Sequence, residues 1–405
     1  MKKFNKVLSV VVASAMVMAM AGCGNTDNGS AATGTNAATE SAAASDSAAS
    51  GSVFKIGGIG PTTGGAAVYG LAVQHGAEIA VEEINAAGGI NGYQVEFKFQ
   101  DDEADAEKSV NAYNALKDWG AQVLDGSTTS GACIAVTDKT KEDNMFQITP
   151  SGSAVECVQY DNNFRVCFSN PNQGLASAQY IGENGLAEKI AVIYDSSDVY
   201  SSGIYEKFVK EAENQPFEVV AAEAFTADNK TDFSVQLQKA KDAGADMVFL
   251  PIYYQESALI LTQAAAMGYA PKWFSCDGMD GILGGVDNFD VSLTEGVMLL
   301  TPFAADATDD LTQSFVTKYK EKYGETPNQF AADSYDAIYV IKAAIEKSGV
   351  TPDMSVSDIC DGMKAAMTEI TVDGLTGNGM TWTADGEANK APKAVVIENG
   401  AYKAM

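Results

Sequence analysis

The sequence lacks most of the side chains on which catalytic and phosphate-binding sites depend. It has a single histidine, His75, and a single arginine, Arg165, among its 405 residues. One histidine cannot supply a multi-histidine metal site, and it leaves no usable Ser-His-Asp set. The 54 acidic residues against 26 basic ones give a net charge of −28, which repels phosphate. We therefore expect a protein that is not an enzyme, with no metal, no cofactor and no nucleic-acid partner.

Nucleotide-binding and nucleophile motifs are missing as well. The sequence contains no GxxxxGK and no GxSxG, and the glycine-rich loop at 57–65 lacks the GxGxxG spacing of a dinucleotide site. The six cysteines show no CxxC spacing. Cys157 and Cys167 are the only pair that is close in sequence, and both a disulfide and two buried thiols fit that pattern.

The N-terminal segment has the pattern of an export signal. Three lysines precede the apolar stretch 7–21, which is too short to span a membrane. It ends in Met-Ala-Gly-Cys at Cys23, which resembles the bacterial lipobox. We predict a signal peptide at 1–22, and a lipid anchor on Cys23 with a flexible tether through 23–52, where only small or polar residues follow the cysteine. The folded body would then be held at the extracellular face of the cell membrane.

From residue 53 onwards, strand-like and helix-like segments alternate. The predicted strands are 53–59, 93–99, 122–124, 146–149, 189–194, 217–224, 246–250, 273–275 and 296–300. The predicted helices are 69–87, 106–119, 130–141, 174–184, 201–214, 233–243 and 256–267. This alternation predicts an α/β fold of two doubly wound parallel-sheet lobes, with a ligand pocket between them at the carboxyl ends of the strands. We assign no helix or strand after residue 300.

An ordered set of phrases carries a resemblance to a known family. They are FKIGGIGP at 54–61, GAEIAVEEINAAGGING at 76–92, ITPSGS at 148–153, RVCFSNPNQG at 165–174, and GLTG at 374–377 followed by Asp385-Gly386. The set resembles type I periplasmic binding proteins, in the Leu/Ile/Val-binding group of ABC importers, and the lipobox suggests the lipoprotein form found in Gram-positive bacteria. The resemblance covers about 53–400.

The resemblance implies a three-stranded hinge, because the chain of that family crosses between the lobes three times. Carried onto this sequence, lobe one comprises 53–170 plus 303–379. Lobe two comprises 172–301 plus 381–405.

The resemblance also implies polar ligand-binding residues in loops after strands. The hydroxyl-rich segment 127–130 follows a strand and opens a helix, which suits an anion. Ser130 matches the family's carboxylate-binding serine, and Ser151 and Ser153 match residues that bind the carboxylate and ammonium of the ligand. Asp277 matches the acidic residue that pairs with the ammonium, and Asp280 is a competitor for that role.

Aromatic residues complete the implied site. Tyr69, Tyr200 and Tyr253 match positions that line the cleft, and Phe330 matches a wall of the side-chain pocket. Each could instead pack within its own lobe.

The function implied is that of a monomeric binding protein, which takes up a free amino acid, branched-chain or otherwise apolar, and delivers it to ABC permease and ATPase subunits. An amide, a urea-like compound or a carboxylic acid on the same fold is an alternative, as is a sensor that reports occupancy to a membrane kinase.

Overall fold

The structure is a computed structural model that describes residues 51–405. The predicted signal peptide, Cys23 and nearly all of the predicted tether lie outside the described residues. None of the described helices combines the length and the apolar character needed to cross a membrane.

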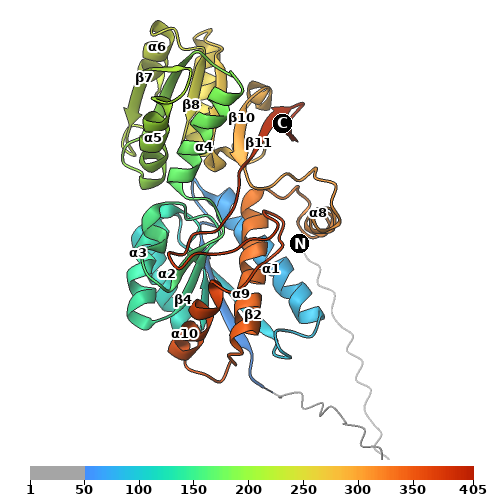
Figure 1. Ribbon diagram of the computed structural model, residues 1–405. Coiled ribbons are helices and arrows are strands. Elements are labelled where there is room, and N and C mark those ends of the chain that lie inside the picture. Colours follow the sequence, from blue (N-terminus) through green and yellow to red (C-terminus); the bar gives the residue numbers. More distant parts are fainter. Residues whose placement is uncertain (1–50) are drawn as a thin grey trace, which may run out of the picture. The chain divides into compact units, whose positions relative to one another are not determined.

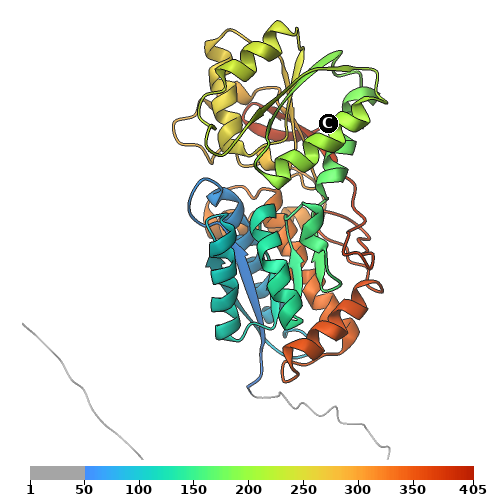
Figure 2. The ribbon, with the colours of Figure 1, turned by 90° about the vertical axis from the view of Figure 1, so that its left-hand side faces the viewer.

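Lobe one is built on a five-stranded parallel sheet of order β2-β1-β3-β4-β5. Its strands are β1 (Phe54–Gly60), β2 (Val95–Asp101), β3 (Val123–Asp125), β4 (Phe146–Thr149) and β5 (Asn163–Arg165). One face packs against α1 (Ala67–Ala86), α9 (Gln329–Ser348) and α10 (Val356–Met367), and the other against α2 (Ala106–Trp119) and α3 (Ser130–Asp143), as Figures 1 and 2 show. The helix α8 (Asp310–Tyr323) packs beside α1.

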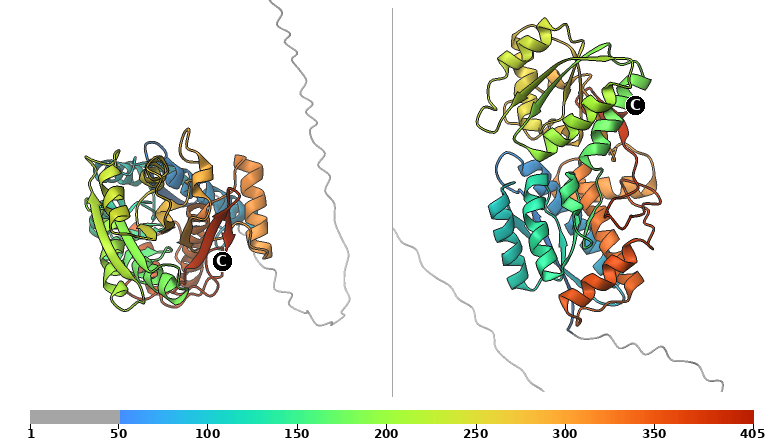
Figure 3. Two further views of the ribbon diagram at one scale, coloured as in Figure 1. Left: turned by 90° about the horizontal axis from the view of Figure 1, so that it is seen from above. Right: turned by 60° about the vertical axis from the view of Figure 1, so that its left-hand side comes forward.

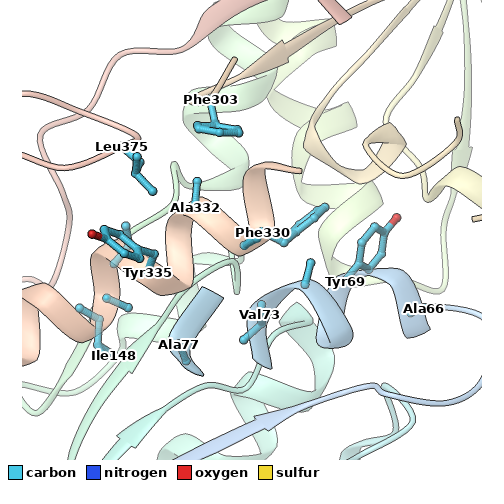
Figure 4. Close-up of a cluster of buried hydrophobic side chains, with 14 of the residues drawn as sticks. Ala66, Tyr69, Val73, Ala77, Ile148, Phe303, Phe330, Ala332, Tyr335 and Leu375 are labelled. Atoms are coloured by element: carbon cyan, nitrogen blue, oxygen red, sulfur yellow. The ribbon is translucent and has the colours of Figure 1, made fainter. Parts of the chain in front are cut away.

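The centre of lobe one is the contact between α1 and α9. Gly76 makes this contact possible, because a Cβ on it would lie 2.0 Å from the carbonyl oxygen of Ala331. Tyr69 and Phe330 lie at the same end of the two helices (Figure 4), and their rings are 4.4 Å apart. The packing of these helices therefore brings two predicted site residues together.

Lobe two is built on a seven-stranded sheet of order β12-β11-β10-β9-β8-β6-β7. Its parallel strands are β6 (Lys189–Asp195), β7 (Glu218–Phe225), β8 (Met247–Leu250), β9 (Lys272–Ser275) and β10 (Met298–Thr301), and its antiparallel strands are β11 (Lys393–Glu398) and β12 (Ala401–Ala404). The parallel strands repeat the strand order of lobe one, as the doubly wound prediction requires.

The central strands of lobe two, β6, β8, β9 and β10, are mainly buried, as expected of a parallel sheet covered on both faces. Ile190 and Val192 pack on the side of α4 (Asn170–Glu183) and α5 (Val199–Ala212), while Ala191 and Ile193 pack on the side of α6 (Ser234–Asp242) and α7 (Tyr254–Ala266). Successive side chains of a strand thus point into opposite apolar cores. This explains why the sequences of these strands are apolar without interruption.

Each predicted strand and helix overlaps an observed one, and β4 and α2 have the predicted bounds. The prediction missed β5, α8, α9, α10, β11 and β12. Short 3₁₀ turns at Val155–Val158, Asp277–Met279 and Val291–Thr294 were not predicted either. All five cysteines in the described part are buried free thiols, so no bridge joins Cys157 to Cys167.

The chain passes between the two sheets three times: after β5, after β10 and before β11. We expected the third passage near 379–381. However, the indole of Trp382 donates to the carbonyl of Arg165 at 2.8 Å, and the amide of Arg165 donates to the carbonyl of Gly386 at 3.0 Å. Because these contacts hold 382–390 against lobe one, we propose that the third passage lies at 391–392.

A buried ion pair fixes this last segment. Lys390 Nζ lies 2.7 Å from Asp333 Oδ1 in α9, and the two side chains are only 1% and 2% exposed. Lys390 also donates to the carbonyl of Val166 at 3.0 Å, so one ammonium joins α9, the first passage and the third. Burial raises the pKa of Asp333 to about 6 although Lys390 opposes this shift, which shows how strongly the site disfavours an unpaired charge.

We predict that Lys390→Met lowers the free energy of unfolding by about 3–5 kcal/mol, because it leaves the Asp333 carboxylate buried without its cation. Denaturant unfolding of the variant measures this. Lys347→Met, which removes one partner of an exposed pair with Glu369, is the matched control and should change stability by less than about 1 kcal/mol. Equal effects of the two variants would contradict the role of the buried pair.

Candidate ligand-binding site

A small pocket of about 10 Å³ lies where the carboxyl ends of the two sheets face each other. Its lining residues come from loops and helix starts that follow strands: Tyr69, Thr128, Thr129, Ser130, Ser151, Tyr200, Tyr253, Asp277, Gly278 and Phe330. The volume is about that of one water molecule. Seven of the eight predicted ligand-binding residues line this pocket, and the eighth, Ser153, does not.

Asp277 is the only charged side chain among the lining residues. It follows β9 and is 4% exposed. Tyr200 Oη donates to one carboxylate oxygen at 2.6 Å, and Gln173 Nε2 donates to the other at 2.7 Å. Burial raises the pKa of Asp277 to about 7, with the two hydrogen bonds opposing this shift. The hydrogen bonds from these two neutral donors therefore offset the cost of burying the carboxylate only in part.

Gly278 allows Tyr200 to reach the carboxylate. Tyr200 is the second residue of α5 in lobe two, and its hydroxyl accepts the amide of Gly278 at 2.9 Å while it donates to Asp277. A Cβ on Gly278 would lie 2.6 Å from that hydroxyl oxygen, so any side chain there would displace Tyr200. Glycine is therefore needed at this position for close approach.

Hydroxyl groups form the lobe-one side of the pocket. Ser130 Oγ accepts the amides of Ser153 and Ala154 at 3.2 and 3.1 Å. Thr129 Oγ1 is buried and has no hydrogen-bonding partner within the described chain. Both residues stand at the start of α3, which has no side-chain cap, so the positive end of the helix dipole faces the pocket.

Ser151 has a different hydrogen-bonding role. Its hydroxyl donates to the carbonyl of Thr128 at 2.5 Å, so its proton is already used and its oxygen remains free to accept. Ser153 lies behind the pocket, where its amide supports Ser130 and its carbonyl accepts the amide of Asn170 at 2.7 Å. The direct contact of Ser153 with a ligand stays a prediction, and its hydroxyl lies 3.5 Å from that of Ser130, which does line the pocket.

Arg165 anchors the 152–154 loop through hydrogen bonds to its backbone. Its side chain is fully buried and donates to the carbonyls of Gly152 and Ala154 at 3.1 and 2.9 Å. Its Nε lies 3.3 Å from Glu387 Oε2. The guanidinium therefore fixes the loop whose amides donate to Ser130, and Glu387 offsets its charge.

Aromatic rings form the remaining walls. Tyr253 stacks on Tyr200 with 5.0 Å between ring centroids, and it meets Tyr69 edge to face at 5.5 Å. Tyr69 Oη donates to the carbonyl of Gly278 and accepts the amide of Tyr254 at 3.3 Å. These contacts join lobe one to lobe two at the wall of the pocket.

Asp280 has a different place from Asp277. It does not line the pocket, and its Oδ2 accepts the amide of Gln329 at 3.0 Å at the start of α9. Sequence reasoning could not separate the two carboxylates, because both follow β9. The 3₁₀ turn at Asp277–Met279 is what turns them in different directions.

Several residues of the site were not predicted. Thr128 and Thr129 belong to the hydroxyl-rich segment 127–130, so the sequence pattern that indicated an anion site already included them. Gln173 and Gly278 act through contacts between distant segments, and Arg165 acts through Gly152 and Ala154; no local pattern marks any of them. Gln173 is 104 residues from the carboxylate that it binds.

Comparison with known proteins identifies the family. The family profile described as periplasmic binding protein matches residues 53–401. Leu/Ile/Val-binding protein homolog 3 of Brucella melitensis is 30% identical over 300 residues, which cover 74% of this chain and 80% of that one. The leucine-, isoleucine-, valine-, threonine-, and alanine-binding protein of Pseudomonas aeruginosa is 30% identical over 302 residues, or 73% and 78% of the two chains.

The chain belongs to the periplasmic binding protein family.

A solved structure confirms the type I fold of this periplasmic binding protein. The branched-chain amino acid transporter substrate binding protein LivJ of Streptococcus pneumoniae, in complex with isoleucine, matches with a TM-score of 0.78 at 28% identity. The match covers 87% of this chain and 98% of LivJ. The predicted family and the predicted fold class are both confirmed, whereas the lipoprotein form stays a prediction. These relatives are named for binding and transport, not for a reaction.

We predict that Asp277→Asn stabilises the ligand-free binding protein at pH 8. The raised pKa means that the folded state holds the proton more tightly than the unfolded chain, so ionisation costs stability as the pH rises from about 4 to about 7. The amide carries no charge and avoids this cost, which gives a gain of about 2–4 kcal/mol at pH 8 that shrinks at pH 5.

Denaturant unfolding at the two pH values measures the gain. The exposed Asp228→Asn is the control, which should have no pH-dependent effect of this size. A difference between Asp277→Asn and the parent protein that is equal at pH 5 and pH 8 would rule out the explanation from burial.

Proposed function

We propose that this protein is an extracellular solute-binding lipoprotein of an ABC importer, and that it binds a free amino acid, branched-chain or otherwise apolar, between its lobes. The observation that carries this proposal is Asp277. Its carboxylate faces the pocket, is almost fully buried, and accepts only from neutral donors among the described residues. An ammonium group on the ligand would supply the missing positive charge.

The opposite side of the pocket suits the carboxylate of the same ligand. Ser130 Oγ accepts two amides and lies 3.5 Å from Ser153 Oγ, and in this proposal its proton is donated to the ligand. Thr129 Oγ1 is likewise free to donate, and the start of α3 contributes its dipole. Ser151, whose proton is already used, would accept from the ammonium. The two poles of the pocket thus match the two charges of a zwitterion.

The aromatic walls suit an apolar side chain. Tyr69, Tyr253 and Phe330 present ring surface to the pocket. The similar proteins from Brucella melitensis and Pseudomonas aeruginosa are named as binding proteins for leucine, isoleucine and valine, which supports the same class of ligand here.

Membership of the family and the N-terminal sequence support the delivery step of this proposal. In this proposal, the lipid on Cys23 holds a monomeric receptor at the outer face of a Gram-positive membrane, and permease and ATPase subunits take up the ligand. The sequence 1–52, which supports this anchoring, lies almost wholly outside the described residues.

The alternative ligands lack one of the two charges. A carboxylic acid would leave Asp277 without a cation, and an amide or a urea-like compound would leave the hydroxyl side without an anion. Neither arrangement explains both poles, so the free amino acid is the better match.

The decisive experiment is calorimetry of the ligand-free protein with free amino acids, each compared with its amide and with the carboxylic acid that lacks the amino group. We expect saturable binding of an apolar amino acid only. In Asp277→Asn the affinity for it should fall by about 10²–10³-fold, because the ammonium loses its charged partner.

Asp280→Asn is the matched control. The residue lies three positions further along the chain and outside the pocket, so its substitution should change amino-acid affinity less than about threefold. Binding of a carboxylic acid or an amide, with no response to any free amino acid, would replace the proposed ligand. An affinity unaffected by Asp277→Asn would refute the role of the carboxylate.

A further inference from the structure

Two cysteines from different elements of lobe one lie together next to the 152–154 loop. Cys133 is in the first turns of α3, and Cys157 is in the 3₁₀ turn at Val155–Val158; both are fully buried. The right-hand view of Figure 3 shows α3 covering one face of the lobe-one sheet. With Ala154, the two cysteines form a small buried cluster that is separate from the larger apolar cores. Neither thiol has a part in the proposed binding of a ligand.

Two contacts place the Cys157 thiol at the turn of α3 that carries Cys133. Cys157 Sγ donates to the carbonyl of Ser130 at 3.7 Å, and Ser130 precedes Cys133 by one helical turn, so both lie on the same side of the helix. The thiols of Cys133 and Cys157 are also hydrogen-bonded to each other. No hydrogen bond joins Cys157 to Cys167 within residues 51–405. The structure therefore pairs Cys157 with Cys133, although Cys167 is closer in sequence.

The surroundings of the two thiols give them different reactivity. The hydrogen bond with Cys157 lowers the pKa of the Cys133 thiol, and the charge of Arg165 acts in the same direction. Gln147 Nε2 also donates to Cys133 Sγ at 3.5 Å. Burial instead raises the pKa of Cys157. Because the thiolate is the form that attacks a disulfide, these surroundings favour Cys133 as the attacking residue.

We propose that Cys133 and Cys157 form a disulfide when the chain folds in an oxidising medium, such as an exported protein meets. The oxidant is a small-molecule disulfide. The Cys133 thiolate attacks one of its sulfurs and releases one thiol, and the Cys157 thiolate then attacks the Cys133 sulfur and releases the second. The two cysteines lose two electrons, and their protons end on the two released thiols. Because both side chains are buried in the folded protein, the exchange takes place while the chain folds or opens locally.

The bond fastens the segment that supports Ser130. This segment passes close to Cys133, since a Cβ on Gly152 would lie 3.0 Å from Cys133 Cβ, and its amides at Ser153 and Ala154 donate to Ser130 Oγ. Joining α3 to the 3₁₀ turn closes the chain around this segment, which restricts the unfolded chain. The bridged form is therefore more stable than the reduced form, whichever ligand the pocket takes.

Peptide mapping tests the pairing. The parent protein is reduced in denaturant, refolded with reduced and oxidised glutathione, alkylated with iodoacetamide in denaturant, and digested with trypsin without reduction. Trypsin places Cys133 on the peptide 118–139 and Cys157 on the peptide 142–165, apart from Cys167. We expect these two peptides to be joined and to separate after reduction, with Cys167 alkylated. Alkylated Cys133 and Cys157, or a bridge from Cys157 to Cys167, would overturn the proposal.

Thermal unfolding measures the consequence of the bond. The protein refolded with glutathione should unfold about 3–6 °C above the protein refolded with dithiothreitol. Cys157→Ala should remove this difference between the two preparations. Cys167→Ala is the matched control, because it also replaces a buried thiol but leaves the bridge, and it should keep the difference. Equal midpoints for the two preparations of the parent protein would contradict the stabilising role of the bond.

Discussion

The buried carboxylate of Asp277 is the constraint on which the rest of the site depends. A charge that is 4% exposed is costly unless something compensates for it, and the protein compensates only in part, with a phenol and an amide. Placing those two donors requires the start of α5, the start of α4 and a glycine directly after the acid. Lobe two therefore positions two neutral donors at the Asp277 carboxylate but places no cationic side chain against it.

The fold explains how the opposite pole comes to face that charge. Both lobes have the same strand order, and in each the loops after the strands meet at one edge of the sheet. Two such edges placed face to face bring hydroxyls and a helix start from one lobe opposite a carboxylate from the other. The buried pair of Lys390 and Asp333 fastens the last linking segment to lobe one, so the arrangement does not rely on the pocket residues alone.

Much of this could be read from the sequence, for physical reasons that particular elements illustrate. The strands at 189–194 and 246–250 are apolar on both faces and are followed by amphipathic helices, so their class and order were clear. In contrast, α9 buries 14 of its 20 residues, and these include the polar Gln329, Asp333, Ser334 and Asp336, so its polar side chains do not mark a solvent-facing side. The hairpin of β11 and β12 breaks the βα alternation, although its turn residues Asn399 and Gly400, both with positive φ, carry a recognisable signal.

The candidate site divides in the same way. Residues directly after a strand, such as Ser151 and Asp277, could be proposed from position. Partners that act across long separations could not, because nothing local in RVCFSNPNQG indicates that Gln173 binds an acid after β9, or that Arg165 supports a loop. The choice between Asp277 and Asp280 likewise depended on one short turn.

The size of the pocket implies that the two lobes must separate before a ligand can bind. A volume of about 10 Å³ cannot admit an amino acid, and the rings of Tyr69, Tyr253 and Phe330 occupy the space around it. The hydrogen bonds that hold the lobes together at the pocket are few: Tyr69 with Gly278 and Tyr254, and Gln329 with Asp277 and Asp280. Each contributes only about 1 kcal/mol net, so the packing of Tyr69 against Tyr253 and Tyr254 supplies much of the contact between the lobes. The same acid that makes the ligand-free contact unfavourable would therefore stabilise the lobes around a bound cation, which couples ligand binding to lobe closure.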